Sequence, residues 1–209
     1  MTSSALRSWL AAGALSVAAV LLCMACVDRP VADSVQAHLR QTALFAWTTR
    51  ALGLLPLVLI LVLVFLLGAG CRALDGRPLG AWTRTPLLCS WSVVWSLSAT
   101  IVLKHIVGRS SADPLYVVRR VYEFHWLHGS PGYDAFPSGA TAIAAALLSV
   151  VWIRVPRLRA VCGLVLAVVS LALIITNGHW VSDILGGGFL GASTGWMTVL
   201  LSREASGIH

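Results

Sequence analysis

Two ionisable side chains near the C-terminal end of the chain, His179 and Asp183, have a spacing that suits acid–base or nucleophilic chemistry. Residues four apart lie on one face of a helix, so the Asp183 carboxylate can accept a hydrogen bond from one imidazole nitrogen. The other nitrogen is then free to act as a nucleophile or a base. A lone histidine at a membrane edge is usually structural, but an acid one turn away in an otherwise uncharged segment favours chemistry.

A second motif places two cations, Lys104 and Arg109, on either side of Gly108. Five residues of helix separate them by about 7.5 Å along the axis, so they converge only if the helix ends near Gly108 and the chain turns back. Two converging cations suit a phosphate group. An equally good interpretation is that each of these long side chains extends its charge to the lipid headgroups.

A third motif, Pro137-Ser138-Gly139, comes directly before an apolar run. Ser138 is a favoured residue type for the cap of a helix. The unpaired N–H groups at a helix start form an anion site, so Ser138 and Gly139 are candidates for holding a phosphate. Taken alone, the motif predicts no more than an ordinary helix cap.

Strongly apolar segments carry these motifs. Of the 209 residues, 58% are hydrophobic and 11% are charged, and the mean hydropathy is +0.85. This composition excludes a disordered chain, a coiled coil and an ordinary soluble domain. A spanning helix needs ~20 apolar residues. We therefore predict one all-α domain over residues 1–209, an integral membrane bundle of six helices with spans at about 9–27, 51–70, 85–103, 139–153, 160–176 and 182–201.

Arginine-rich connections predict the orientation of this bundle, because loops that stay in the cytoplasm retain Lys and Arg. Two connections are rich in arginine and are predicted to be cytoplasmic: their residues are Arg72, Arg77, Arg84, Arg154, Arg157 and Arg159. The three motifs then share the opposite face. Topology accounts for most of the net charge of +7, and no nucleotide-binding loop or basic repeat indicates a nucleic-acid partner.

The three motifs, in this order and spacing, resemble the type 2 phosphatidic acid phosphatase family, membrane lipid phosphatases related to vanadium haloperoxidases. That family reads K-x6-R-P, then P-S-G-H, then S-R-x5-H-x3-D, on a core of six membrane helices. Lys104 matches the first motif, Pro137-Ser138-Gly139 match three of the four residues of the second, and His179 with Asp183 match the third. The resemblance covers roughly residues 104–188.

The chain departs from the family pattern at three positions. Ser111 stands in place of the first motif's Arg, and Arg109 is the expected substitute as a phosphate ligand. Leu173 stands in place of the third motif's Arg, which gives Asn177 a polar role. Ala140 stands in place of the second motif's His, which protonates the leaving group in the family.

The resemblance implies a phosphohistidine mechanism. His179 attacks phosphorus, Asp183 orients the imidazole, and the phosphate is held by Lys104, Arg109, Ser138 and Gly139. It implies a lipid phosphate or pyrophosphate as substrate, contact with membrane lipids, and neither a metal, a cofactor nor an obligate protein partner. The expected location is a bacterial inner membrane with the site on the extracytoplasmic side.

Two explanations of Ala140 stay open. It is either an introduced or local substitution that inactivates an otherwise ordinary phosphatase, or a natural loss for which His125 or His128 compensates. Residues 116–126, which include His125, mix apolar and charged side chains, and this mixture predicts a short helix near the headgroups. The alternative functions are a non-catalytic membrane protein that binds lipid phosphates and a small transporter.

Overall fold

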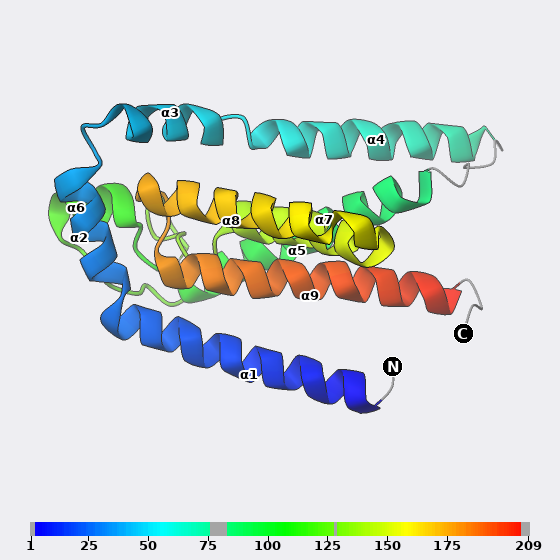
Figure 1. Cartoon of the computed structure of the whole chain (residues 1–209), viewed down its shortest axis with the longest axis horizontal. Helices are drawn as coiled ribbons and strands as arrows, with labels where there is room; N and C mark the ends of the chain where they lie inside the picture. Colours follow the sequence, from blue (N-terminus) through cyan, green and yellow to red (C-terminus); the bar gives the residue numbers. More distant parts are fainter. Residues whose placement is uncertain (1–2, 76–82, 128, 206–209) are drawn as a thin grey trace.

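The computed structural model describes residues 3–75, 83–127 and 129–205, and it is built from helices (Figure 1). Helices α1 to α5 span Ser3–Cys26, Asp28–His38, Ala43–Leu52, Pro56–Leu74 and Arg84–Val107; α7, α8 and α9 span Gly139–Arg154, Arg159–Ile175 and Val181–Ala205. Three short turns of helix complete the described chain: η2 (Ala112–Tyr116), α6 (Val117–Arg119) and η3 (Pro156–Leu158).

Within the residues that the structure describes, five stretches are long and apolar enough to cross a membrane: Ser4–Cys26, Ala43–Arg72, Arg84–Val107, Pro156–Ile175 and Val181–Ser202. The sixth predicted span, α7, has 16 residues. At ~1.5 Å per residue it falls short of the ~30 Å thickness of a bilayer core. Helices α5, α8 and α9 all pack against α7. Five of the six predicted spans are therefore long enough to cross a bilayer, and the sixth, α7, is a shorter apolar helix packed among them.

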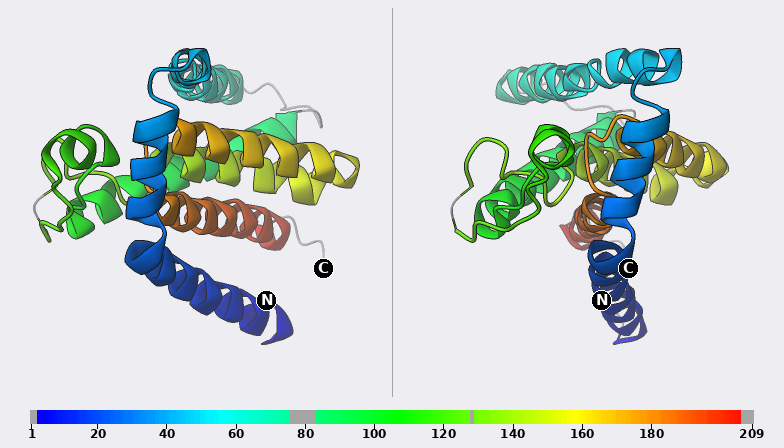
Figure 2. Two further views of the ribbon diagram at one scale, coloured as in Figure 1. Left: turned by 60° about the vertical axis from the view of Figure 1, so that its left-hand side comes forward. Right: turned by 90° about the vertical axis from the view of Figure 1, so that its left-hand side faces the viewer.

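The connection predicted between residues 28 and 50 is mostly helical. Helix α2 crosses the end of the bundle, and α3 runs nearly in line with α4 (Figures 1 and 2). A short turn at 53–55 separates α3 from α4, directly before Pro56. Proline has no N–H to donate and disfavours helical geometry at the residue before it, so it breaks the continuity of the two helices.

A seam of glycines brings α9 against α7. Gly187, Gly191 and Gly195 lie one turn apart on α9. Gly191 and Gly195 face carbonyl groups of α7, and Gly187 faces the carbonyl of Ser138, the residue that caps α7. A Cβ atom at Gly191 would overlap the carbonyl oxygen of Ala142, and one at Gly195 would lie 2.6 Å from that of Ala146. Such close backbone contact is available only to glycine. The seam fixes the start of α9 beside the start of α7.

Helix α5 ends at Val107 because Gly108 takes the left-handed conformation, with φ 54° and ψ 49°. The chain then doubles back, and Arg109 pairs with Phe124 in an isolated antiparallel bridge. The helix predicted over 116–126 is limited to the turns that end at Arg119. Beyond them the chain runs mainly without helix to Trp126, because it pairs with the segment after Gly108.

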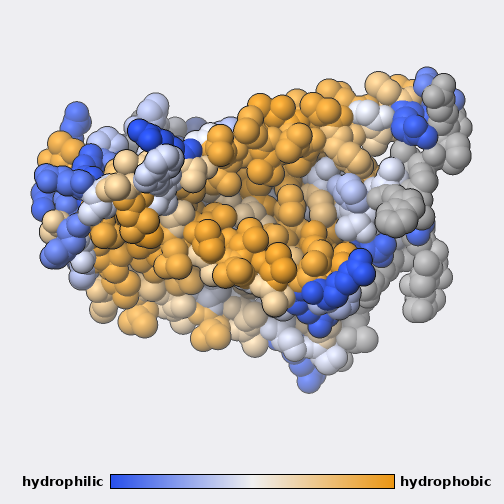
Figure 3. Space-filling model, turned by 45° about the horizontal axis from the view of Figure 1, so that its top comes forward, coloured by the Kyte–Doolittle hydropathy of each residue, from blue (hydrophilic) through white to orange (hydrophobic). Residues whose placement is uncertain are grey.

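The surface supports a membrane location. Apolar side chains cover the middle of the molecule, and hydrophilic residues gather towards its two ends (Figure 3). The interior between the helices is lined by small residues, among them Ala142, Ala145 and Ala146, each no more than 1% exposed. Large apolar side chains face outward instead, as expected where the surrounding solvent is lipid.

Candidate active site

The start of α9 holds His179 and Asp183 together. Asp183 is completely buried, and its Oδ2 accepts a hydrogen bond of 3.1 Å from the backbone N–H of Trp180. His179 lies in the turn before the helix, with Nδ1 3.6 Å from the same oxygen. The predicted pair is therefore adjacent, but a capping turn and not one helix face brings it together. The same carboxylate of Asp183 therefore caps the helix and faces the imidazole.

Ser138 starts α7 as predicted. Its Oγ accepts hydrogen bonds from the N–H of Thr141 at 3.4 Å and from the Thr141 hydroxyl at 3.0 Å. Its own N–H donates to the backbone carbonyl of Asp183 at 3.0 Å. This last bond joins the second and third sequence motifs directly, across 45 residues of chain.

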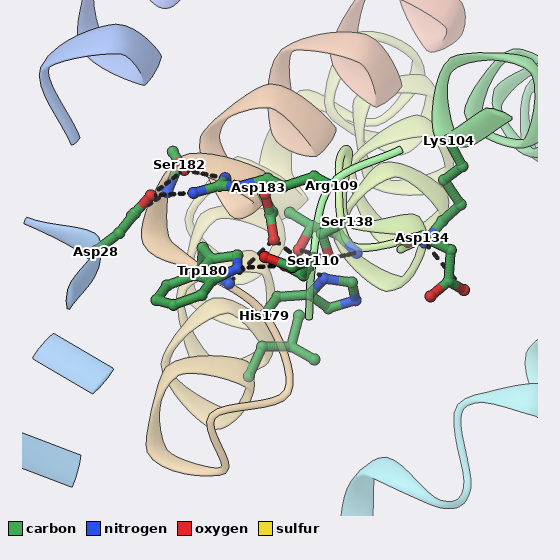
Figure 4. A network of polar contacts seen from close by, with 12 residues as sticks. Asp28, Lys104, Arg109, Ser110, Asp134, Ser138, His179, Trp180, Ser182 and Asp183 are labelled. Carbon is green, nitrogen blue, oxygen red and sulfur yellow. Dashed lines mark hydrogen bonds and ion pairs between the residues drawn. The ribbon is translucent and has the colours of Figure 1, made fainter. Parts of the chain in front are cut away.

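Lys104 reaches the same region from the last turn of α5 (Figure 4). Its Nζ donates to the backbone carbonyl of Asp134 and lies 4.0 Å from the carboxylate of that residue. The aliphatic part of the side chain passes Gly139, where a Cβ atom would lie 3.9 Å from Cε of the lysine. Lys104 is therefore next to the start of α7, although Asp134 is its partner in this structure.

Arg109 is turned away from Lys104 and is buried, with its side chain 1% exposed. Nη1 donates to the Ser182 hydroxyl at 2.6 Å and to Asp183, and Nη2 donates to Asp28 at 2.6 Å and to the Tyr122 hydroxyl at 2.8 Å. Both terminal nitrogens are thus occupied by protein groups. Burial opposes the charged form, but the carboxylates of Asp183 and Asp28 raise the pKa of Arg109 above its ordinary value.

Aromatic rings surround this guanidinium. Its central carbon lies 5.3 Å from the ring centre of Tyr122, 5.6 Å from that of Phe124 and 5.3 Å from that of Trp180. Cation–π attraction at such distances adds to the ion pairs. The Trp180 indole donates to the carbonyl of Ser110 at 2.8 Å, which ties the segment after α5 to the start of α9.

Sequence reasoning missed Asp28, Tyr122 and Ser182, which complete the buried network around Arg109. One signal was available for Asp28, an acid that follows directly on the first apolar segment. That position alone did not distinguish Asp28 from an ordinary loop residue. Its partners lie 81 and 154 positions further along the chain.

The other predicted polar residues lie apart from this cluster. Asn177 donates from its amide to the carbonyl of Ala32 at 3.1 Å, which fastens the turn before α9 to α2. His125 contacts Glu123 at 3.2 Å and stacks on Tyr133 with ring centres 3.9 Å apart. His128 lies outside the described residues.

Two positions at which the sequence departs from the expected pattern, Ala140 and Leu173, have apolar surroundings. Ala140 lines a groove of about 300 Å³ between α4, α7 and α8, together with Pro56 and Val169. Leu173 is buried one turn beyond Val169 on α8, and a Cβ atom at Gly178 would lie 3.7 Å from its Cδ2. Within 3–75, 83–127 and 129–205, no group of three or more His, Cys, Asp or Glu side chains is placed to hold a metal ion.

Comparisons with known proteins agree with this architecture. The model of the PAP2 superfamily matches residues 86–206, more than half of the chain. No curated protein matches the sequence. A crystal structure of a transmembrane PAP2 type phosphatidylglycerolphosphate phosphatase from Bacillus subtilis superposes with a TM-score of 0.62 at 19% sequence identity. The match covers 91% of this chain and 96% of that one, so the two share a fold.

Proposed function

The chain belongs to the PAP2 superfamily, and from this premise we propose that it is a membrane phosphatase acting on a lipid phosphate or pyrophosphate. The observation that carries the proposal is the junction of α7 and α9. There the imidazole of His179 lies 3.6 Å from the Asp183 carboxylate, and Ser138 at the start of α7 is bonded to the backbone of Asp183. A nucleophile, its orienting acid and a helix N-terminus thus meet at one end of the bundle.

The proposed reaction has two steps. Nε2 of His179 attacks phosphorus, the bond from phosphorus to the leaving oxygen breaks, and that oxygen takes up a proton. Water then hydrolyses the N–P bond, which releases phosphate and restores the imidazole. Asp183 accepts the Nδ1–H of the ring and offsets the positive charge that develops on it. The present separation of 3.6 Å closes to a hydrogen bond when substrate binds, as catalytic contacts often do.

The phosphate oxygens are proposed to lie between Lys104 and the start of α7. The Ser138 amide is used by the Asp183 carbonyl, and the Thr141 amide is used by the Ser138 hydroxyl. The amides of Gly139 and Ala140 have no acceptor within the first helical turn, so they are the donors proposed to face the anion. Lys104 would leave Asp134 and contribute its charge. Arg109, expected from the sequence as a phosphate ligand, is assigned a supporting role behind Asp183.

Ala140 bears on the choice of substrate. Loss of a general acid typically costs ~10² to 10⁴ in rate when the leaving oxygen is strongly basic. A phosphate leaving group, with a pKa of about 6, needs far less help than an alkoxide. The chain as it stands is therefore proposed to prefer a lipid pyrophosphate over a monophosphate.

A non-catalytic role in binding lipid phosphates is the second candidate. It is favoured by the apolar groove at Ala140 and by the burial of Leu173, because both positions lack the polar groups that the family pattern places there. Under this alternative, Lys104 and the start of α7 would still bind the anion, but no phosphate would be released.

Restoring the missing histidine separates the two candidates. We expect purified Ala140→His to release inorganic phosphate from phosphatidic acid in detergent micelles at least ~100-fold faster than the unmodified chain. The gain on an isoprenyl pyrophosphate should be smaller. Ala144 lines the same groove one turn further along α7, so Ala144→His is the matched control and should give no gain.

Adding His179→Ala to Ala140→His should remove the activity. Binding of both lipids without any phosphate release, in the unmodified chain and in Ala140→His alike, would contradict the phosphatase proposal and support the binding role.

A further inference from the structure

The carboxylate of Asp28 occupies an unusual position for the first residue of a connecting helix. Its side chain is completely buried at the end of the bundle where α2 meets α9. Oδ1 accepts a hydrogen bond of 3.0 Å from the backbone N–H of Ser182, and Oδ2 accepts from Arg109 at 2.6 Å and from the Ser182 hydroxyl. A buried carboxylate is costly unless such donors surround it, so this arrangement is specific.

The arrangement changes the charge that His179 experiences. Arg109 contacts Asp183 on the side away from the imidazole. A guanidinium paired with Asp183 alone would cancel the charge of that carboxylate. Asp28 supplies a second carboxylate to the same guanidinium, so the buried cluster keeps one net negative charge beside the ring.

Asp28 also fixes the position of the guanidinium. Arg109 is held between Asp28 and Asp183 through its two terminal nitrogens, while Ser182 bridges to both Asp28 and Arg109. Since Ser182 and Asp183 are consecutive, the contacts of Asp28 determine how the first turn of α9 is placed. That turn sets the direction of the Asp183 carboxylate.

We propose that Asp28 is a positioning residue for the reaction at His179: it holds Arg109 and the first turn of α9 in place and offsets the guanidinium charge. Asp183 then acts on the imidazole as an uncompensated anion. The inference rests on the proposed phosphatase function. In the step where the N–P bond forms and the bond to the leaving oxygen breaks, the ring becomes cationic, and the surplus negative charge stabilises it.

The test uses the full chain carrying Ala140→His, in which phosphate release from phosphatidic acid is measured over a range of lipid concentrations. Asp28→Asn should lower kcat by about 10- to 100-fold while KM changes less than about 3-fold. The reason is that Lys104 and the start of α7, which hold the phosphate, are untouched. Asp33→Asn is the matched control. Asp33 lies on the same helix but pairs with the exposed Arg120, so it should change kcat by less than about 2-fold.

A double variant distinguishes charge balance from simple support of the fold. Asp28→Asn with Arg109→Gln removes one carboxylate and one guanidinium, which restores the net negative charge of the cluster. Under the proposal the double variant turns over faster than Asp28→Asn alone. A double variant slower than the single one would show that Asp28 acts only by supporting the fold, and would overturn the proposal.

Other outcomes are also decisive. If Asp28→Asn does not fold, Asp28→Glu replaces it and is compared with Asp33→Glu; a lowered kcat at unchanged KM in the first alone supports the proposal, and equal kcat values overturn it. An active parent with an equally active Asp28→Asn variant overturns this inference alone. If the parent acts on an isoprenyl pyrophosphate alone, the same variants are compared on that lipid. A parent that releases phosphate from neither lipid overturns the proposed function and this inference together.

Discussion

His179 and Asp183 divide two tasks between adjacent side chains. Asp183 is completely buried, caps α9 and pairs with Arg109, whereas His179 is 17% exposed and its Nδ1 faces only that carboxylate. The side chain of His179 therefore contributes little to the stability of the fold. Replacing His179 should therefore affect turnover much more than stability. Replacing Asp183 should lower the stability of the fold much more than replacing His179 does.

The first prediction concerns turnover. In the Ala140→His background, His179→Ala should abolish phosphate release while lipid affinity stays within about 3-fold, because Lys104 and the start of α7 remain. Phosphate release and lipid titration of the intrinsic tryptophan fluorescence measure the two quantities. His38, exposed at the end of α2, provides the control: His38→Ala should leave both unchanged. Phosphate release by His179→Ala at the restored rate would rule out the phosphohistidine step.

The second prediction concerns stability. Asp183→Asn removes one partner of a buried ion pair, so the free energy of unfolding should fall by about 3–5 kcal/mol. His179→Ala should lower it by less than about 1 kcal/mol, since the ring makes one long contact. Denaturation of both variants in the same detergent compares them. Equal losses of unfolding free energy in the two variants would mean that the ion pair between Asp183 and Arg109 does not stabilise the fold.

Spacing in the sequence predicted Lys104, Ser138, His179 and Asp183 as site residues, and the structure brings the last three together. Ser138, His179 and Asp183 meet at one junction, and Lys104 lies beside it with Asp134 as its partner. The direction of Arg109 was not predictable. Gly108 indicated that the chain turns, but the choice between a phosphate and a protein carboxylate depends on Asp28, 81 residues earlier.

At the scale of helices, the packing of α7 against α9 determines the geometry of the junction. Gly187, Gly191 and Gly195 let the two backbones touch, and the contact ends at Ser138, whose N–H bonds to the carbonyl of Asp183. Any separation of the helices would move the helix start away from His179.

The third prediction tests this seam. Gly191→Ala places a methyl group against the carbonyl of Ala142, so it should lower the free energy of unfolding by about 1–3 kcal/mol and reduce turnover. Gly188→Ala is the matched control, because its Cβ would meet Thr141 at an ordinary 3.8 Å. We expect that variant to be as stable as the parent or slightly more so. A Gly191→Ala variant with unchanged thermal unfolding would show that the helices separate without cost.

Apolar length predicted the helices well, and it predicted the connections poorly. The last span was expected at about 182–201 and is observed as Val181–Ala205, since a run of lipid-facing residues has clear ends. Helix α2 was missed because its sequence is largely polar, and its position depends on the contacts that Asp28 and Asn177 make across the fold. Such contacts leave no periodic pattern.

At the scale of the whole molecule, the two ends of the bundle differ in composition. The end that carries the candidate site holds α2, α6 and the start of α9, and the first turn of α1 and the last turn of α9 lie towards the other end (Figure 1). The connection between α7 and α8, at the end away from the site, carries Arg154, Arg157 and Arg159 without an acid. By the positive-inside rule, we expect that end in the cytoplasm and the site on the opposite face.

The fourth prediction uses the protein's own thiols to test the orientation. Cys26 is exposed at the end of α1 near the site, and Cys71 is exposed near the end of α4 at the opposite end. A membrane-impermeant maleimide added to intact spheroplasts should label a variant that retains only Cys26. A variant that retains only Cys71 should be labelled only after permeabilisation. The reverse pattern would place the site in the cytoplasm.

The burial of Asp28 also has a consequence for how the protein is made. The ribosome synthesises Asp28 early, but its partners Arg109 and Ser182 follow 81 and 154 residues later. Helix α1 therefore forms long before its end next to Asp28 can be fixed, and the buried cluster closes only when α9 is added. Because closure requires residues from the beginning, middle and end of the chain, a truncated nascent protein leaves an unpaired carboxylate exposed. The buried cluster therefore cannot close until the start of α9 has been synthesised.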